Sequence, residues 1–84
     1  MKIAFDFGIT NTDVAVQDKQ ELSFYTFSSK KVEIAFILEI LSEINLDTKL
    51  ITKIVVTGGK SSDLQDALHD IPIIKINEVE AVGH

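Results

Sequence analysis

The stretch that most constrains the fold lies near the amino terminus, where a short apolar segment runs into a polar turn. Residues 5–13 read Phe-Asp-Phe-Gly-Ile-Thr-Asn-Thr-Asp. Asp6 ends a strand that is expected to be buried, and Gly8 is expected to adopt the positive φ of a tight turn. The residues that follow offer hydroxyl and amide groups beside free backbone N–H groups. The pattern predicts a β-hairpin suited to a phosphate and its magnesium ion.

Taken alone, this motif is more simply interpreted as a β-hairpin whose glycine and threonine residues only form the turn. A second glycine motif changes the balance, because residues 57–60 (Thr-Gly-Gly-Lys) follow an apolar, β-branched run over 53–57. Such a run is typical of a parallel central strand covered on both faces. Ser62 and Gln65 form a capping-box pattern, which predicts a short helix over about 63–69. Its N–H groups would then face an anion beside the glycines.

The remaining pattern completes an α/β domain. Apolar residues crowd more than one face of a helix predicted within 32–44, so this helix is expected to be mostly buried, with Ser28 or Ser29 as its cap. The predicted order is β-β-β-α-β-α-β, with a mixed five-stranded sheet. Strands are predicted over residues 2–7, 13–17, 22–27, 53–57 and 73–76.

Composition excludes several functions. The chain has 84 residues and a net charge of −5, from thirteen acidic residues against eight lysines. This balance opposes binding to a nucleic-acid backbone. There is no cysteine, hence no disulfide and no thiolate site. No stretch approaches the roughly 20 apolar residues of a membrane span, and we expect a soluble, cytoplasmic protein that binds neither membrane nor nucleic acid.

The element order and the two glycine motifs resemble the ribonuclease-H-like half of the superfamily of sugar kinases, heat-shock ATPases and actin. Within it, the type II pantothenate kinases are most similar. They have an N-terminal D-x-G-G-T-type hairpin, a strand ending in T-G-G and a later strand followed by Glu. Residues 6–10 (Asp-Phe-Gly-Ile-Thr), residues 57–59 and Glu78 match these features in order. The resemblance spans all 84 residues and about the N-terminal third of such a kinase.

This resemblance implies ATP and Mg²⁺ as cofactors and phosphoryl transfer to a small hydroxyl substrate, with pantothenate as the first candidate, in coenzyme A biosynthesis. Asp6 would serve the metal and catalysis, and Glu78 would be the general base. Ile9 departs from the family pattern, which has a second glycine at this position. The implied cofactor-binding residues are Gly8, Thr10, Asn11, Thr12, Thr57, Gly58 and Gly59.

The resemblance also implies that residues 1–84 form a single N-terminal actin-like subdomain, truncated from a longer kinase and inactive alone. The implied partners are nucleotide, a small-molecule substrate, and either the missing C-terminal domain or a second copy of the chain. Two alternatives remain open. One is an ATPase of the acyl-CoA dehydratase activator type, although those use cysteines to hold an iron–sulfur cluster. The other is a non-catalytic interaction or regulatory domain, which Ile9 favours. The acceptor substrate is not determined by these motifs.

Overall fold

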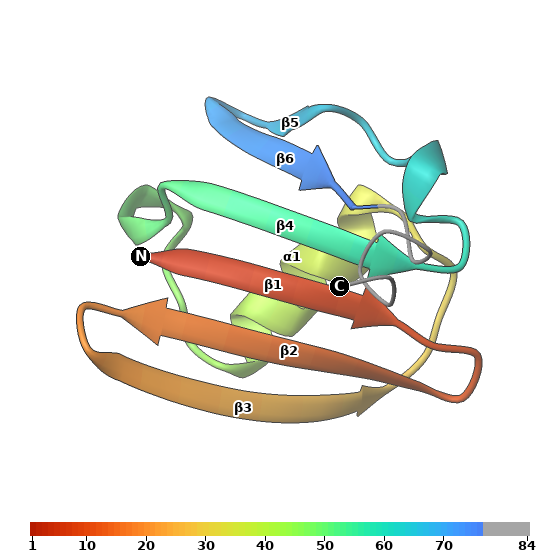
Figure 1. Ribbon diagram of the computed structural model, residues 1–84, viewed down its shortest axis with the longest axis horizontal. Coiled ribbons are helices and arrows are strands. Elements are labelled where there is room, and N and C mark those ends of the chain that lie inside the picture. Colours follow the sequence, from red (N-terminus) through yellow and green to blue (C-terminus); the bar gives the residue numbers. More distant parts are fainter. Residues whose placement is uncertain (77–84) are drawn as a thin grey trace.

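Six strands form one mixed sheet in the computed structural model, which describes residues 1–76 (Figure 1). Their order across the sheet is β3-β2-β1-β4-β6-β5. The predicted Glu78 lies outside the described residues. The elements are β1 (Lys2–Phe7), β2 (Asn11–Asp18), β3 (Glu21–Ser28), α1 (Ile34–Glu43), the 3-10 turn η1 (Thr48–Leu50), β4 (Lys53–Gly58), the 3-10 turn η2 (Ser61–Asp63), β5 (Ala67–Leu68) and β6 (Ile71–Lys75).

The strand directions confirm the predicted meander followed by parallel strands. β1, β2 and β3 pair antiparallel in sequence order, whereas β4 pairs parallel with both β1 and β6. The helix α1 provides the crossover between β3 and β4. Because parallel neighbours end at the same edge, the turns after β1 and β4 lie side by side. The domain is an α/β half-domain of the ribonuclease-H-like type, as the sequence predicts.

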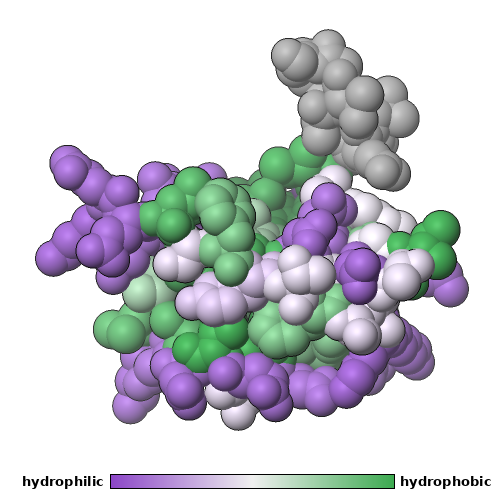
Figure 2. All heavy atoms as spheres, turned by 90° about the horizontal axis from the view of Figure 1, so that it is seen from below, coloured by the Kyte–Doolittle hydropathy of each residue, from purple (hydrophilic) through white to green (hydrophobic). Residues whose placement is uncertain are grey.

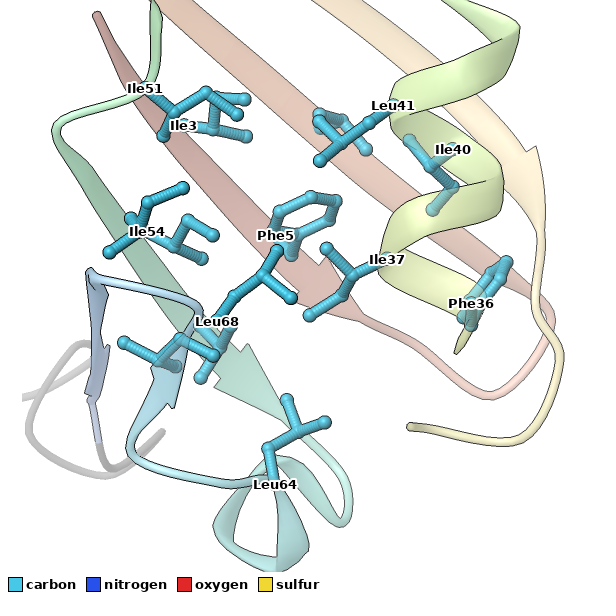
Figure 3. Packing of buried hydrophobic residues seen from close by; sticks show 14 of the residues in the cluster. Ile3, Phe5, Phe36, Ile37, Ile40, Leu41, Ile51, Ile54, Leu64 and Leu68 are labelled. Atoms are coloured by element: carbon cyan, nitrogen blue, oxygen red, sulfur yellow. The ribbon is translucent and has the colours of Figure 1, made fainter. Parts of the chain in front are cut away.

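One face of the sheet carries the hydrophobic core. Alternate residues of β1, β2 and β4 point toward α1, which lies behind the sheet in Figure 1. Figure 3 shows Ile37, Ile40 and Leu41 of α1 directed at Phe5 and Ile3 of β1. These side chains are almost completely buried. Burial of this continuous apolar layer is the main stabilising contribution to the fold.

The prediction that α1 is mostly buried is wrong, because the helix is buried along one side only. Its buried residues are Phe36, Ile37, Ile40 and Leu41, spaced as on a single helical face. The apolar side chain of Leu38 on the opposite side is 39% exposed. The predicted serine cap is also wrong, because the N-cap residue is Glu33, which makes no side-chain capping bond.

The predicted second helix over 63–69 does not form. A single 3-10 turn, η2, is followed by an extended Leu64 and then by β5, which pairs antiparallel with β6. The side chain of Gln65 donates to the carbonyl of Ala67 at 3.1 Å, so it is not part of a capping box. A helix of this length has little stability of its own, whereas the β5–β6 hairpin buries Leu68. The sheet consequently has six strands, and not five.

The opposite face of the sheet bears no helix within residues 1–76 (Figure 1). The β4 residues on this face, Lys53, Val55 and Thr57, are half-buried, so the expected burial of both faces is not complete in the described part of the chain. No helix in residues 1–76 has the length and apolar character needed to cross a membrane.

Candidate functional site

The turn after β1 is tightly closed on itself. The N–H of Gly8 donates to the carbonyl of Asn11 at 3.1 Å, which closes the β1–β2 hairpin. A Cβ at Gly8 would lie 2.5 Å from the same carbonyl oxygen, so only glycine fits here. The expected positive φ of Gly8 is wrong, because Gly58 is the only glycine of the described residues with a positive φ. Gly8 is required for its lack of a side chain, and not for a left-handed backbone.

The turn after β4 lies directly against the end of β1. Gly58 has φ +99°, and a Cβ there would lie 2.4 Å from the carbonyl oxygen of Phe7. The N–H of Gly59 donates to this same carbonyl at 3.1 Å. A Cβ at Gly59 would meet no atom within 4 Å, so the backbone of Gly59 borders open space. The two glycines therefore have different roles, since Gly58 allows the strands to approach and Gly59 leaves open space beside its Cα.

Ser29, just after β3, holds the β1–β2 turn in place. Its N–H donates to the carbonyl of Thr10 at 2.9 Å, and its hydroxyl donates to the carbonyl of Gly8 at 2.6 Å. Because that hydroxyl has one proton, the hydroxyl of Thr12 must donate in the 3.0 Å contact between Thr12 and Ser29. Sequence reasoning assigned Ser29 only as a possible helix cap. The polar residues 28–31, directly after the predicted third strand, were the sequence feature that could have indicated a contact between Ser29 and the β1–β2 turn.

Replacing Ser29 with alanine is expected to loosen this turn. The change removes two side-chain hydrogen bonds and leaves the hydroxyl of Thr12, which is fully buried, without a partner. We expect the free energy of unfolding to fall by about 1–3 kcal/mol, as urea denaturation would measure. Ser42→Ala on the exposed side of α1 is the matched control and should change it by less than about 0.5 kcal/mol. Equal effects of the two changes would contradict this role of Ser29.

An open groove of about 1600 Å³ lies at the carboxyl ends of β1 and β4. Its walls are the β1–β2 turn, the connection from β3 to the start of α1, and the segment from Gly59 to Gln65. Three of the eight lysines of the chain line it, Lys30, Lys31 and Lys60, against the acidic Glu33 and Asp63. Lys30 pairs with Glu39 at 2.7 Å and Lys31 with Glu33 at 3.7 Å. Among residues 1–76, no ion pair involves Lys60.

Asp6 directly precedes the groove residue Phe7, but its side chain is on the face of the sheet away from α1 and does not line the groove. It is exposed, which corrects the expectation of a buried carboxylate. Its cross-strand neighbours are Asp13 on β2 and Thr57 on β4. Asp13 accepts a hydrogen bond from Thr26 at 2.9 Å. The hydroxyl oxygen of Thr57 is buried and has no hydrogen-bond partner within the described chain, so a polar atom next to Asp6 is left unsatisfied.

The structure thus brings the predicted residues together in two groups. Gly8, Thr10 and Gly59 line the groove, whereas Asp6 and Thr57 lie on the adjoining sheet face. The other three residues, Asn11, Thr12 and Gly58, shape the turns: the first accepts from Gly8, the second bonds to Ser29, and the third contacts Phe7. Within residues 1–76, no group of three or more His, Cys, Asp or Glu side chains is arranged to hold a metal ion.

Sites of this kind occur in open α/β sheets, where ligands bind at the carboxyl ends of the parallel strands. The sheet topology is that of a ribonuclease-H-like half-domain, and the groove lies at the carboxyl ends of its parallel strands. No family model matches the sequence, and no curated protein matches it.

Among solved structures, the chain is similar to the activator of 2-hydroxyisocaproyl-CoA dehydratase from Clostridium difficile, determined with bound ADPNP. The two share 22% sequence identity with a TM-score of 0.63. The match covers 93% of this chain and 29% of the activator chain. The chain therefore spans less than a third of the length of that protein, and the likeness concerns the fold.

Proposed function

We propose that this chain is the phosphate-binding half of an ATP- and magnesium-dependent phosphotransferase. The observation that carries the proposal is the open space beside the Cα of Gly59 in a lysine-lined groove. The N–H of Gly59 is bonded to the carbonyl of Phe7, so a phosphate there would meet the neighbouring Lys60 and not this N–H. Peptide groups without a neighbouring side chain can approach a phosphate closely. The turn at Gly8 to Thr10 forms the facing wall.

Charge supports an anionic ligand in the groove. The whole chain is acidic, yet three lysines and two acidic residues line this groove. Lys60 lies next to Gly59, with the left-handed backbone φ of 62°. Since this residue has no ion pair within residues 1–76, its ammonium group can meet a phosphate without first leaving a carboxylate.

Replacing Lys60 with alanine is expected to weaken binding of ATP three- to tenfold, the loss of about one charged contact to phosphate. Isothermal titration calorimetry with and without Mg²⁺ would measure it. Lys49→Ala in η1, before the start of β4, is the control, because it removes the same charge away from the groove. If both variants bind ATP as the unchanged chain does, Lys60 does not contact the nucleotide.

The residues beside the groove also fit a magnesium ion. Mg²⁺ in phosphate sites is commonly held by one or two carboxylates together with water and phosphate oxygens, so a cluster of three protein ligands is not needed. Asp6 is exposed near the carboxyl end of β1, and the unsatisfied hydroxyl of Thr57 lies on the neighbouring strand β4. When bound, the ion would neutralise charge on the phosphates. Asp6 would hold it, directly or through water.

The acceptor in this proposal is a small hydroxyl compound, and pantothenate is our first choice because of the family resemblance. Glu78, outside the described residues, would take the proton of the attacking hydroxyl. The chain would be a subdomain of a longer cytoplasmic kinase whose further domain completes the nucleotide pocket. A groove of this openness, walled by one half-domain, is consistent with a site that needs a second wall.

A dehydratase-activator type of ATPase is the second candidate, and the similarity to the activator with bound ADPNP favours it. Against it, these 84 residues contain no cysteine, so this segment cannot supply a thiolate to a cluster. A non-catalytic interaction domain is the third candidate. It is favoured by Ile9, whose apolar side chain is fully exposed at the tip of the β1–β2 turn.

Release of ADP by the longer parent chain, with and without pantothenate, separates these candidates. Release that requires pantothenate supports a pantothenate kinase. Release at the same rate without any acceptor supports an activator-type ATPase. If ATP neither binds nor turns over, the proposed function is wrong and the interaction domain is favoured.

A further inference from the structure

The two edges of the sheet differ in the way that they are protected. β5 forms one edge and has two residues, whereas β3 forms the other and has eight. All eight residues of β3 pair with β2 one to one, so no bulge interrupts the strand. Its outer side has no partner within the described chain. A long, regular and unpaired edge is a template for a further strand.

The composition of β3 lacks the features that usually block such pairing. The strand contains no proline and no glycine, and Glu21 is its only charged residue. Leu22, Phe24 and Tyr25 are 56%, 72% and 39% exposed. Figure 2 views the molecule from the side of β3 and shows apolar surface exposed there among polar groups. Natural edge strands are usually short, charged or bent, so this edge is expected to have a partner.

The direction of the free backbone groups follows from the hairpin. A two-residue loop joins β2 and β3, so Asp18 and Glu21 form the first hydrogen-bonded pair. Along the two strands, hydrogen-bonded pairs then alternate with pairs whose backbone groups point outward. The N–H of Ser29 donates to the carbonyl of Thr10, which agrees with this alternation. The N–H and C=O groups of Leu22, Phe24 and Thr26 consequently point away from β2.

We propose that β3 pairs antiparallel with β3 of a second copy of this chain, around a two-fold axis next to Phe24. Phe24 then lies opposite Phe24 of the second copy, and Leu22 lies opposite Thr26. Each copy supplies the same free groups, so one contact removes both exposed edges and closes as a dimer. The result is a continuous sheet through two domains.

The side chains on the open face select this register. Phe24, Ala15, Ala4, Val55 and Ile74 are cross-strand neighbours and form one apolar row across the sheet. With Phe24 at the axis, the row continues without a break into the row of the second copy. A shift of one residue would place the side chains of opposing residues on different faces.

Charge favours the antiparallel direction over the parallel one. The turn end of β3 carries Asp18 and Glu21 together with Lys19, so it remains negative by one charge, and the other end is followed by Lys30 and Lys31. Antiparallel pairing brings the acidic end of each strand to the basic end of the other. These lysines are exposed and already have Glu39 and Glu33 as neighbours, so salt should weaken the attraction.

Single-cysteine variants test the pairing directly, because the chain has no cysteine of its own. Residues opposite each other in a hydrogen-bonded pair have Cα atoms about 5.5 Å apart, which a disulfide can span. Under mild oxidation, Phe24→Cys is expected to form covalent dimer at least tenfold faster than Tyr25→Cys or Ile74→Cys. Equal or faster cross-linking of Tyr25→Cys overturns the register, and fast cross-linking of Ile74→Cys instead indicates stacked open faces.

Solution mass is the second measurement and does not depend on a disulfide. Light scattering should give a dimer for the unchanged chain and for Ile74→Lys, and a monomer for Phe24→Lys, in which two ammonium groups would oppose each other. Circular dichroism of all three proteins checks that they fold alike. A monomer of the unchanged chain at millimolar concentration, or a dimer of Phe24→Lys as stable as that of the unchanged chain, overturns the proposal. ATP binding plays no part in either result.

Discussion

Alanine in place of Gly58 is expected to lower the free energy of unfolding by about 3 kcal/mol or more. The backbone of the alanine would have to keep φ +99°, and its Cβ would lie 2.4 Å from the carbonyl oxygen of Phe7. Left-handed backbone costs about 1–2 kcal/mol for a non-glycine residue, and forced overlap costs roughly 1–3 kcal/mol more. The change would also separate β4 from β1 at the edge that forms the groove. Urea denaturation followed by circular dichroism measures the effect.

Gly59→Ala is the matched control, since it adds the same methyl group to the next residue. Its Cβ would meet no atom within 4 Å, and its φ lies outside the left-handed region. We therefore expect stability to change by less than about 1 kcal/mol. Binding of ATP should weaken nevertheless, because the methyl group would occupy space in the groove. Equal losses of stability in the two variants would contradict the different roles assigned to these glycines.

Asparagine in place of Asp6 is expected to weaken binding of Mg-ATP tenfold or more, with little change in the binding of ATP without magnesium. The substitution keeps the size of the side chain and removes the charge that would hold the ion. Calorimetric titration with and without Mg²⁺ measures the affinity for Mg-ATP and the affinity for ATP alone separately.

The stability of the same variant separates binding from folding. Asp6 lies opposite Asp13 in the sheet, and like charges in this position repel. We therefore expect Asp6→Asn to leave stability unchanged or to raise it by less than about 1 kcal/mol. Asp18→Asn, at the turn end of β2, is the charge-matched control and should retain full affinity. If both variants bind Mg-ATP equally well, Asp6 is not a metal residue.

The strands could be predicted from the sequence because their hydrophobic pattern is strong and local. β1 and β4 match the predicted ranges within one residue, and the parallel placement of β4 is confirmed. The segment 63–69 could not be predicted correctly, since its choice between helix and hairpin depends on pairing with β6 and on the burial of Leu68 in the core that the whole sheet and α1 form. Local capping signals are weak beside such a tertiary contact.

The candidate site, too, could be predicted only in part from the sequence. Glycines at 8, 58 and 59 mark both turns in the sequence, but the reason for each glycine depends on neighbours that only the fold supplies. Gly8 avoids the carbonyl of Asn11, and Gly58 avoids that of Phe7. The role of Ser29 could not be predicted either, because its bonds to Gly8 and Thr12 span 21 and 17 residues.

The central claim is that the two glycine turns form one phosphate site. Titration of the chain with Mg-ATP, followed by amide chemical shifts, tests it most directly. We expect the largest shifts at residues 8–10 and 59–60, with little change along β3 and the exposed side of α1. Shifts should shrink in Asp6→Asn. If millimolar Mg-ATP leaves both turns unshifted, the phosphate site proposed here does not exist.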